Sequence, residues 1–128
     1  MGSQKPKRME IKLRPIGVAY RTERKDTMRI VVHPDCVDGL EGIEELHYVD
    51  VLYWMHRLTE EERTILKTHP QRDPSRPLRG VFSLRSPVRP NPIGLTRVRL
   101  LKRQGDTLVV EGLDALDESP VIDIKSGG

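Results

Sequence analysis

The sequence has little cysteine, few aromatic residues and no long apolar run. Cys36 is the only cysteine among 128 residues, which excludes an intramolecular disulfide and a zinc site built from thiolates. No apolar run approaches the roughly 20 residues of a membrane-spanning helix. Residues 1–9 also lack the apolar segment of a signal peptide. These absences argue against the transmembrane, secreted and zinc-finger classes, and they favour a reducing, cytoplasmic setting.

The length of the chain predicts one domain. We interpret residues 1–10 as a polar leader without fixed structure and residues 11–128 as a single domain. A domain of this size buries roughly two-thirds of its unfolded surface, so it needs no metal or disulfide to fold.

Charge is distributed unevenly along the chain. Residues 1–71 have a net charge of zero, residues 72–103 carry +8 and residues 104–128 carry −5. A guanidinium suits phosphate because it presents a planar fork of donors. The arginines between residues 76 and 89 therefore indicate a surface for an anion or a nucleic acid. Arg97, Arg99 and Arg103 are also compatible with a solvated strand face.

Short β-branched and apolar runs predict a mainly β protein: a small closed or nearly closed β-barrel with one or two short helices. Strands are expected over residues 16–20, 29–33, 47–55, 80–85, 95–102, 107–113 and 121–124. The run 47–55 is nearly continuous in apolar character, which is typical of a strand buried on both faces. Gln-Gly-Asp at residues 104–106 predicts the turn of an antiparallel hairpin.

Helix signals are few. Thr59 and Glu62 have the spacing of a capping box, which predicts a helix that ends before Pro70. Residues 36–46 are expected to hold another helical turn, interrupted by Gly39 and Gly42.

Residues 85–95, RSPVRPNPIGL, are the most informative segment. Six of the ten prolines lie between Pro70 and Pro92, which excludes a central strand or a helix interior there. Prolines restrict the backbone, so the loop displays the Asn91 amide and two arginines with little ordering cost on binding. Gly94 permits either a close approach of another segment or a positive φ. A rigid binding loop and a proline-rich corner that closes the barrel are both consistent with these residues.

A second group lies at residues 112–125, GLDALDESPVIDIK. Asp123 stands between Ile122 and Ile124, so its carboxylate is expected on the opposite face of the strand. A buried carboxylate needs a partner, which Lys125 or an arginine of the proline-rich loop can supply. Two roles are open: a buried ion pair that stabilises the barrel, or a carboxylate that contacts a ligand or accepts a proton.

These segments carry a resemblance. GVFSLRSPVRPNPIGLTRVRLL at residues 80–101, followed by residues 112–125, resembles the TsaA-like, or TrmO-type, family. Residues 14–21 and 39–57 resemble its other two blocks, so the resemblance covers residues 11–125. It implies a β-barrel methyltransferase that uses S-adenosyl-L-methionine and methylates N6 of threonylcarbamoyladenosine next to the tRNA anticodon. It also implies a homodimer with the cofactor near the subunit boundary.

The resemblance further implies site residues. Cofactor-binding residues are expected at Arg85, Ser86, Arg89, Pro90, Asn91, Pro92, Gly94, Leu95 and Ser119. Catalytic residues are expected at Asp117, Asp123 and Lys125. The family usually has Asp-Gly-Thr-Pro where this chain has DESP at residues 117–120. Because Glu118 adopts a positive φ less readily than Gly, we expect a different turn here.

Two other functions stay open from the residues alone. One is a non-catalytic barrel that binds RNA or a nucleotide, and the other is a methyltransferase of the same fold that acts on a small molecule. Aromatic residues make up 4% of the chain and Phe82 is its single phenylalanine, which is poor material for stacking bases along a strand of RNA. The histidine and cysteine spacing matches no metal-site geometry, so no metal is expected.

Overall fold

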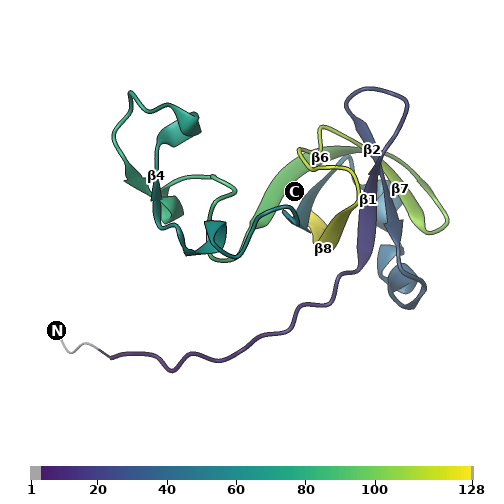
Figure 1. Ribbon diagram of the computed structural model, residues 1–128. Helices are drawn as coiled ribbons and strands as arrows, with labels where there is room; N and C mark the ends of the chain where they lie inside the picture. The colour runs from purple at the N-terminus through teal and green to yellow at the C-terminus, as the bar shows by residue number, and fades with distance from the viewer. Residues whose placement is uncertain (1–3, 128) are drawn as a thin grey trace.

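Six strands form a closed antiparallel barrel in the order β1-β2-β7-β6-β3-β8 (Figure 1). The structure is a computed structural model and describes residues 4–127. The barrel strands are β1 (Gly17–Arg21), β2 (Thr27–Val32), β3 (Tyr48–Trp54), β6 (Ile93–Gln104), β7 (Thr107–Glu111) and β8 (Ser119–Ser126). The predicted fold class is confirmed.

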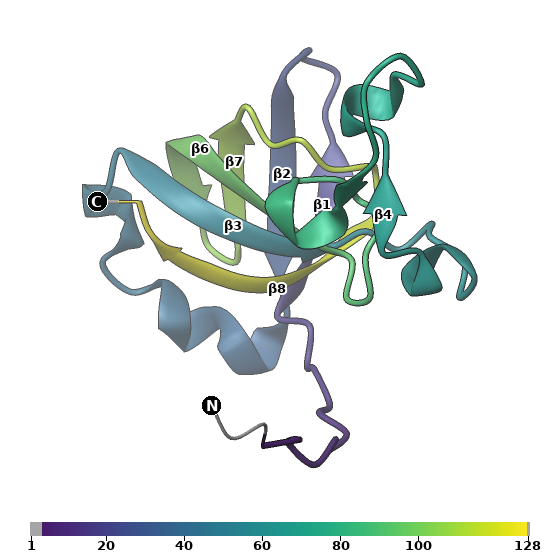
Figure 2. The same ribbon diagram turned by 90° about the vertical axis from the view of Figure 1, so that its left-hand side faces the viewer.

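The remaining regular structure is short. It consists of the 3-10 helices η1 (Pro34–Leu40), η2 (Ile43–Glu45), η3 (Glu62–Thr64), η4 (Pro70–Arg72) and η5 (Val81–Ser83), and of a small sheet that pairs β4 (Lys67–Thr68) with β5 (Arg79–Gly80). Residues 58–88, here called the arm, project to one side of the barrel in Figure 1, and Figure 2 views the molecule from that side. No helix within residues 4–127 has the length and apolar character needed to cross a membrane.

Residues 4–15 form an extended, exposed segment that runs away from the barrel (Figure 1). The barrel begins where the N–H of Ile16 donates to the C=O of Val121 at 2.8 Å. The leader expected over residues 1–10 falls in part on residues 1–3, which lie outside the described residues.

The core of the barrel consists of side chains that alternate along each strand. Val49, Val51 and Tyr53 of β3 are buried, and the residues between them are only half-buried. On β6, Val98 is buried and Arg97 is exposed, so Arg97 lies on a solvated strand face, one of the two possibilities that the sequence leaves open. The expectation that residues 47–55 are buried on both faces is wrong, because a closed barrel has one interior and β3 turns only one face toward it.

The Tyr53 ring packs over the backbone of Gly94 inside the barrel. It lies opposite Gly94 in the strand register, and a Cβ added to Gly94 would lie 2.3 Å from Cζ of the Tyr53 ring. The Tyr53 hydroxyl donates to the C=O of Asp114 at 2.5 Å and lies 3.2 Å from Oγ1 of Thr96. Burial raises the pKa of Tyr53, so the hydroxyl remains a donor at neutral pH. Gly94 therefore serves a close approach, one of its two predicted roles.

The predicted strand over residues 80–85 is wrong for most of its length. Strand pairing there is limited to Arg79–Gly80, because the next three residues form η5. The hydroxyl of Ser83 donates to the C=O of Gly80 at 2.7 Å, and such local bonds compete with strand pairing.

The helical predictions are confirmed only as short 3-10 turns, and the predicted extent of the first helix up to Pro70 is wrong because Lys67–Thr68 form β4. The capping box forms, because the N–H of Thr59 donates to Oε1 of Glu62 at 3.0 Å and the N–H of Glu62 donates to Oγ1 of Thr59 at 3.2 Å. The helix it begins is only η3. Over residues 36–46 the predicted interruption is present, because Gly42 has φ +85° and separates η1 from η2.

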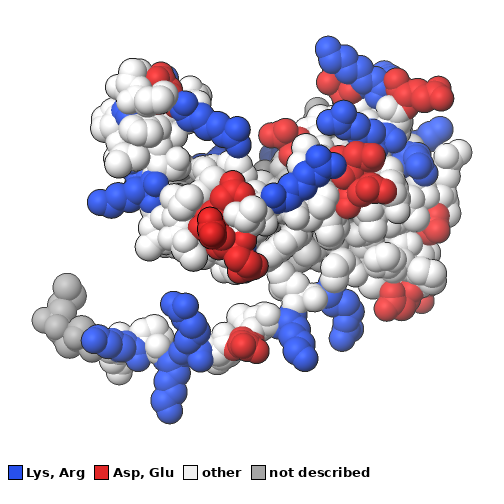
Figure 3. All heavy atoms as spheres, in the orientation of Figure 1, with Lys and Arg blue, Asp and Glu red and all other residues white. Residues whose placement is uncertain are grey.

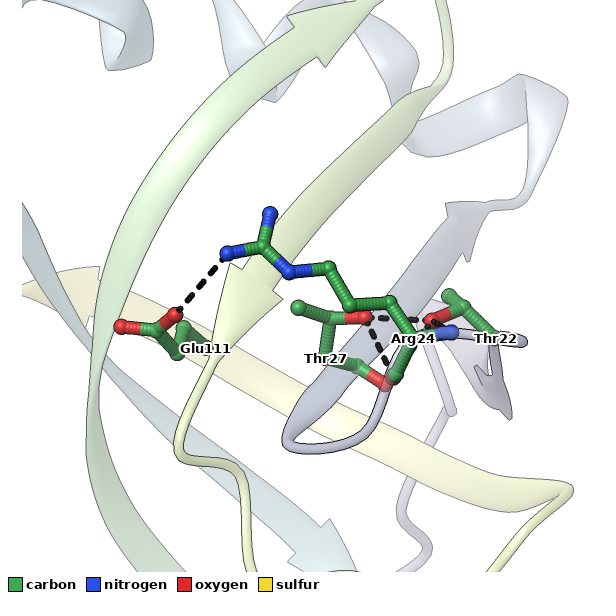
Figure 4. A network of polar contacts seen from close by, with 4 residues as sticks. All are labelled: Thr22, Arg24, Thr27 and Glu111. Carbon is green, nitrogen blue, oxygen red and sulfur yellow. Dashed lines mark hydrogen bonds and ion pairs between the residues drawn. The ribbon is translucent and has the colours of Figure 1, made fainter.

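Polar contacts link the turn between β1 and β2 to β7 (Figure 4). The buried hydroxyl of Thr27 donates to the C=O of Arg24 at 2.9 Å and contacts the hydroxyl of Thr22. The Arg24 guanidinium lies 3.8 Å from the carboxylate of Glu111 at the end of β7. These contacts join the ends of neighbouring strands at one rim of the barrel.

Gly94→Ala is expected to destabilise the barrel, because the added methyl group would overlap the Tyr53 ring. The expected loss is about 1–3 kcal/mol in the free energy of unfolding, measured by urea denaturation followed by circular dichroism. Gly39→Ala is the control, since no heavy atom lies within 4 Å of its added Cβ. Its effect is expected to stay within about 1 kcal/mol. Equal effects at the two positions would contradict the proposed contact.

Candidate functional site

The proline loop, residues 85–92, lies between two clefts. The arginine cleft has a volume of about 880 Å³ and is lined by Arg72, Arg76, Arg79, Phe82 and residues 85–88. The apolar cleft has a volume of about 480 Å³ and is lined by Trp54, Asn91, Ile93, Pro120, Ile122 and Arg63, together with part of the extended segment before β1. Within the described residues, neither cleft is lined by a carboxylate.

The residues expected to bind a cofactor do not share one surface. Arg85 and Ser86 line the arginine cleft, whereas Asn91 lines the apolar cleft. Pro92 is buried, and its C=O accepts the N–H of Met55 at 2.8 Å. Leu95 is 48% exposed on β6 and lines neither cleft. The structure thus distributes the expected set over both sides of the loop and its base.

Arg89 and Pro90 attach the proline loop to the arm. The Arg89 guanidinium donates to the C=O of Val81 at 2.5 Å and to the C=O of Leu84 at 2.9 Å. The Arg63 guanidinium donates to the C=O of Pro90 at 2.7 Å. Hydrogen bonds from a charged donor stabilise more than neutral ones, so these contacts fix the position of the loop.

Two further expected residues lie where the chain turns into β8: Asp117 in the turn and Ser119 as the first residue of the strand. Ser119 is buried, and its hydroxyl donates to the C=O of Leu116 at 2.6 Å. Oδ1 of Asp117 accepts the N–H of Arg21 at 2.8 Å, at the end of β1. Glu118 has φ +67°, a conformation that Gly adopts more readily. The backbone at Glu118 therefore has a conformation that Gly favours, and the expectation that this turn differs from the family's stays a prediction.

Asp123 and Lys125 lie on one outer face of β8. Their charged atoms are 3.6 Å apart and their side chains are 50% and 66% exposed, which excludes a buried ion pair. Ile124 packs against the core, opposite Asp123, as predicted. Ile122 instead lines the apolar cleft, because the pairing of β8 with β3 shifts register here and makes Ile122 an extra residue. The prediction that Ile122 and Ile124 share a face is wrong.

Many lining residues of the two clefts were not among those that the resemblance implies, and three of them, Trp54, Arg63 and Phe82, show why. Trp54 lines the apolar cleft, and strand alternation with the inward Tyr53 could have placed it there. The Arg63 guanidinium lies 5.4 Å from the centroid of the Trp54 ring. This contact joins η3 to the end of β3, and no pattern within either segment predicts it. Phe82 is exposed because the residues around it form η5 rather than the predicted strand.

Comparison with known proteins defines the family. The family model of the tRNA-methyltransferase O N-terminal domain matches residues 14–126, so the chain belongs to this family. A "Probable S-adenosyl-L-methionine-binding protein" of Methanocaldococcus jannaschii is 44% identical over 88% of this chain and 89% of that protein. A relative with the same description in Methanothermobacter thermautotrophicus is 43% identical over 91% of this chain and 90% of that protein.

Solved structures of TrmO from Pseudomonas aeruginosa share the fold. One superposes with a TM-score of 0.70 at 27% identity, over 94% of this chain and 57% of that chain. Another has a TM-score of 0.73 at 24% identity, which speaks for the fold alone. This chain thus spans 57% of the length of the TrmO structure to which it is 27% identical. The family resemblance is confirmed, and the names of the relatives agree with the cofactor that it implies.

Glu118→Gly is expected to stabilise the protein, because it removes the strain of a glutamate at positive φ. The expected gain is about 1 kcal/mol in the free energy of unfolding, after the greater freedom of Gly in the unfolded chain is counted. Thermal melting measures it. Glu41→Gly is the control, since Glu41 is exposed at φ −56° and its replacement is expected to destabilise by up to about 1 kcal/mol. Losses of similar size at both positions would contradict strain at Glu118.

Proposed function

We propose that this chain binds S-adenosyl-L-methionine and methylates N6 of threonylcarbamoyladenosine next to the tRNA anticodon. The observation that carries the proposal is the match of residues 14–126 to the tRNA-methyltransferase O N-terminal domain. Relatives named for S-adenosyl-L-methionine binding support the cofactor, and the likeness to TrmO supports methyl transfer to tRNA. The homodimer and the cytoplasmic location expected from the sequence remain predictions.

The chemistry of the two clefts favours the apolar cleft for the cofactor. S-adenosyl-L-methionine has two cationic groups and one carboxylate, so an arginine-lined cleft disfavours it electrostatically. The apolar cleft, at about 480 Å³, lies in the range of about 300–1,000 Å³ that is usual for small-molecule sites. Trp54 and Ile122 supply apolar walls for the adenosine, and Asn91 supplies a side-chain amide. The residues of this cleft therefore fit the cofactor.

The protein's contribution is positioning and exclusion of water. The bound cofactor supplies an electrophilic methyl group on a sulfonium centre. The restrained proline loop holds Asn91 in place with little loss of entropy on binding, and the apolar walls keep water away. Because no carboxylate among the described residues lines either cleft, we assign the proton released by the acceptor nitrogen to water or to the carboxylate of the threonyl group.

Asp117, Asp123 and Lys125 are assigned positioning roles. Asp117 attaches the turn before β8 to the end of β1 through the N–H of Arg21. Oδ1 of Asp123 accepts the N–H of Ile124 at 2.9 Å, and Oδ2 pairs with Lys125. These contacts stabilise the irregular part of β8 that carries Ile122 into the wall of the apolar cleft.

Titration calorimetry with S-adenosyl-L-methionine tests the cofactor site. Asn91→Ala is expected to weaken binding by about 5- to 150-fold, the equivalent of the 1–3 kcal/mol lost with a buried polar contact. Gln104→Ala, which removes an exposed side-chain amide at the end of β6, is the control and is expected to leave affinity unchanged. Absence of binding by the unmodified chain would overturn the proposal.

The tRNA assignment is tested by incubating tRNA with the protein and the cofactor. Mass analysis of the nucleosides is expected to show a methylated threonylcarbamoyladenosine. Methylation of another acceptor only would overturn that assignment.

Asp123→Asn separates a positioning role from a purely structural one. The ion pair is exposed, so the free energy of unfolding, followed by thermal melting, is expected to change by less than about 1 kcal/mol. Single-turnover methyl transfer is expected to fall by about 10- to 100-fold, because a small displacement of the cleft wall misaligns the reactants. Glu44→Gln breaks the exposed pair with Arg103 and serves as the control, with turnover unchanged. Normal turnover in Asp123→Asn would remove Asp123 from the site.

A further inference from the structure

We propose that Arg63 binds the carboxylate of an N-acylated amino acid in the apolar cleft, and so selects an acceptor base that carries threonine. The inference rests on the proposed function, because it takes threonylcarbamoyladenosine as the methylated nucleoside. It adds the residue that distinguishes this nucleoside from unmodified adenosine. Arg63 then contacts the substituent on the base rather than the phosphates of the RNA.

The position of Arg63 is the first observation. It lies in η3 of the arm, from which other Lys and Arg side chains project into the solvent (Figure 3). The Arg63 guanidinium instead lies 5.4 Å from the centroid of the Trp54 ring, and its Nε donates to the C=O of Pro90 at 2.7 Å. The side chain is only 29% exposed and lines the apolar cleft. The guanidinium is therefore in place before a ligand binds, which reduces the entropy lost on binding.

The guanidinium also has donors for a ligand. Its Nη1 donates to Oε1 of Glu60 at 2.9 Å, but the Glu60 side chain is 88% exposed and does not line the cleft. An ion pair with so exposed a partner contributes little, so a ligand carboxylate inside the cleft can replace it. Within the described residues, no oxygen accepts a hydrogen bond from Nη2 of Arg63. Nη1 and Nη2 together can form the two parallel hydrogen bonds by which Arg binds a carboxylate.

The rest of the lining determines which carboxylate fits. Among residues 4–127, Arg63 is the only charged side chain that lines this cleft. A free amino acid has an ammonium next to its carboxylate, and the methionine part of the cofactor has one too. With no carboxylate in the lining, that ammonium would lose its hydration without gaining a partner. In threonylcarbamoyladenosine the nitrogen of threonine is acylated and uncharged, so a single guanidinium is complementary to it.

The same contact positions the acceptor nitrogen. The carbamoyl group joins threonine to N6, so a carboxylate bound by Arg63 keeps N6 at the apolar cleft, where we propose the cofactor binds. The Trp54 ring lies beside the guanidinium and supplies a flat apolar surface for the substituent. Unmodified adenosine has neither the carboxylate nor the carbamoyl group, so Arg63 does not stabilise its complex.

A ratio of two affinities tests the inference. The probes are two anticodon stem-loop RNAs: one carries threonylcarbamoyladenosine, and in the other its carboxylate is converted to a carboxamide. The unmodified chain is expected to prefer the carboxylate by about 10- to 150-fold, the usual effect of a hydrogen-bonded charge. Arg63→Gln is expected to bind the two RNAs equally. No preference in the unmodified chain, or the same preference in Arg63→Gln, would overturn the inference.

The ratio separates recognition of the carboxylate from a structural role. If Arg63 only held the arm against the proline loop, Arg63→Gln would weaken binding of both RNAs by the same factor and keep the preference. That result would overturn the inference. Arg24→Gln is the control, because it also removes a guanidinium that is paired with an exposed carboxylate, at 3.8 Å from Glu111. It is expected to keep the preference of the unmodified chain.

The cofactor has a carboxylate of its own, so it needs a separate test. Calorimetry compares S-adenosyl-L-methionine with its decarboxylated form, and the ratio of their affinities is expected to be equal in the unmodified chain and Arg63→Gln. A smaller ratio in Arg63→Gln would assign Arg63 to the cofactor's carboxylate and overturn the inference. Cofactor binding with equal methylation of both RNAs would overturn the inference and leave the proposed function intact. Absence of cofactor binding would overturn the proposed function and the inference with it.

Discussion

The packing of the Tyr53 ring onto Gly94 is the contact on which the site depends. Gly94 lies in β6 just after the proline loop, and the absent side chain lets the ring cover its backbone. The hydroxyl of the same ring holds the C=O of Asp114, in the connection that leads to β8. One buried side chain therefore fixes the exit of the proline loop and the approach to Asp117 and Ser119. The two sequence motifs are close in space because both contact β3.

The proline loop separates two environments of opposite electrostatic character. The arginines that line one cleft repel a cation such as a sulfonium, and the apolar lining of the other cleft does so less. The loop contributes to both linings, because Arg85 lines the arginine cleft and Asn91 lines the apolar cleft. Arg63 lines the apolar cleft, but its guanidinium pairs with the Glu60 carboxylate at 2.9 Å and also donates to the C=O of Pro90, whereas Arg89 is half-buried and donates to carbonyls of the arm. Rigidity of the loop and separation of charge thus have a common structural origin.

Most of the barrel could be predicted from the sequence, and the reasons for the exceptions are physical. Strands with one face in the core show alternation, so β6 and its inward Val98 could be found directly. The strand predicted over residues 80–85 is wrong because the hydroxyl of Ser83 forms a local hydrogen bond to the C=O of Gly80. A composition typical of strands does not exclude such a local bond. The position of Ile122 depends on a register shift relative to β3, which alternation along β8 alone cannot show. The resemblance implied the composition of the site, but its division into two clefts depends on contacts between distant segments.

Glu118 shows how tertiary contacts override a local preference. A glutamate at positive φ costs free energy in isolation, and the family's glycine avoids that cost. The chain nevertheless adopts a positive φ here, because the residues on both sides of Glu118 are held: Asp117 by the N–H of Arg21 and Ser119 by burial and its bond to Leu116. Since β8 must start at this point to pair with β1 and to carry Ile122 to the cleft, relaxing the turn would disturb the barrel seam and the apolar cleft together. The strain is local, whereas the contacts that impose it belong to the site.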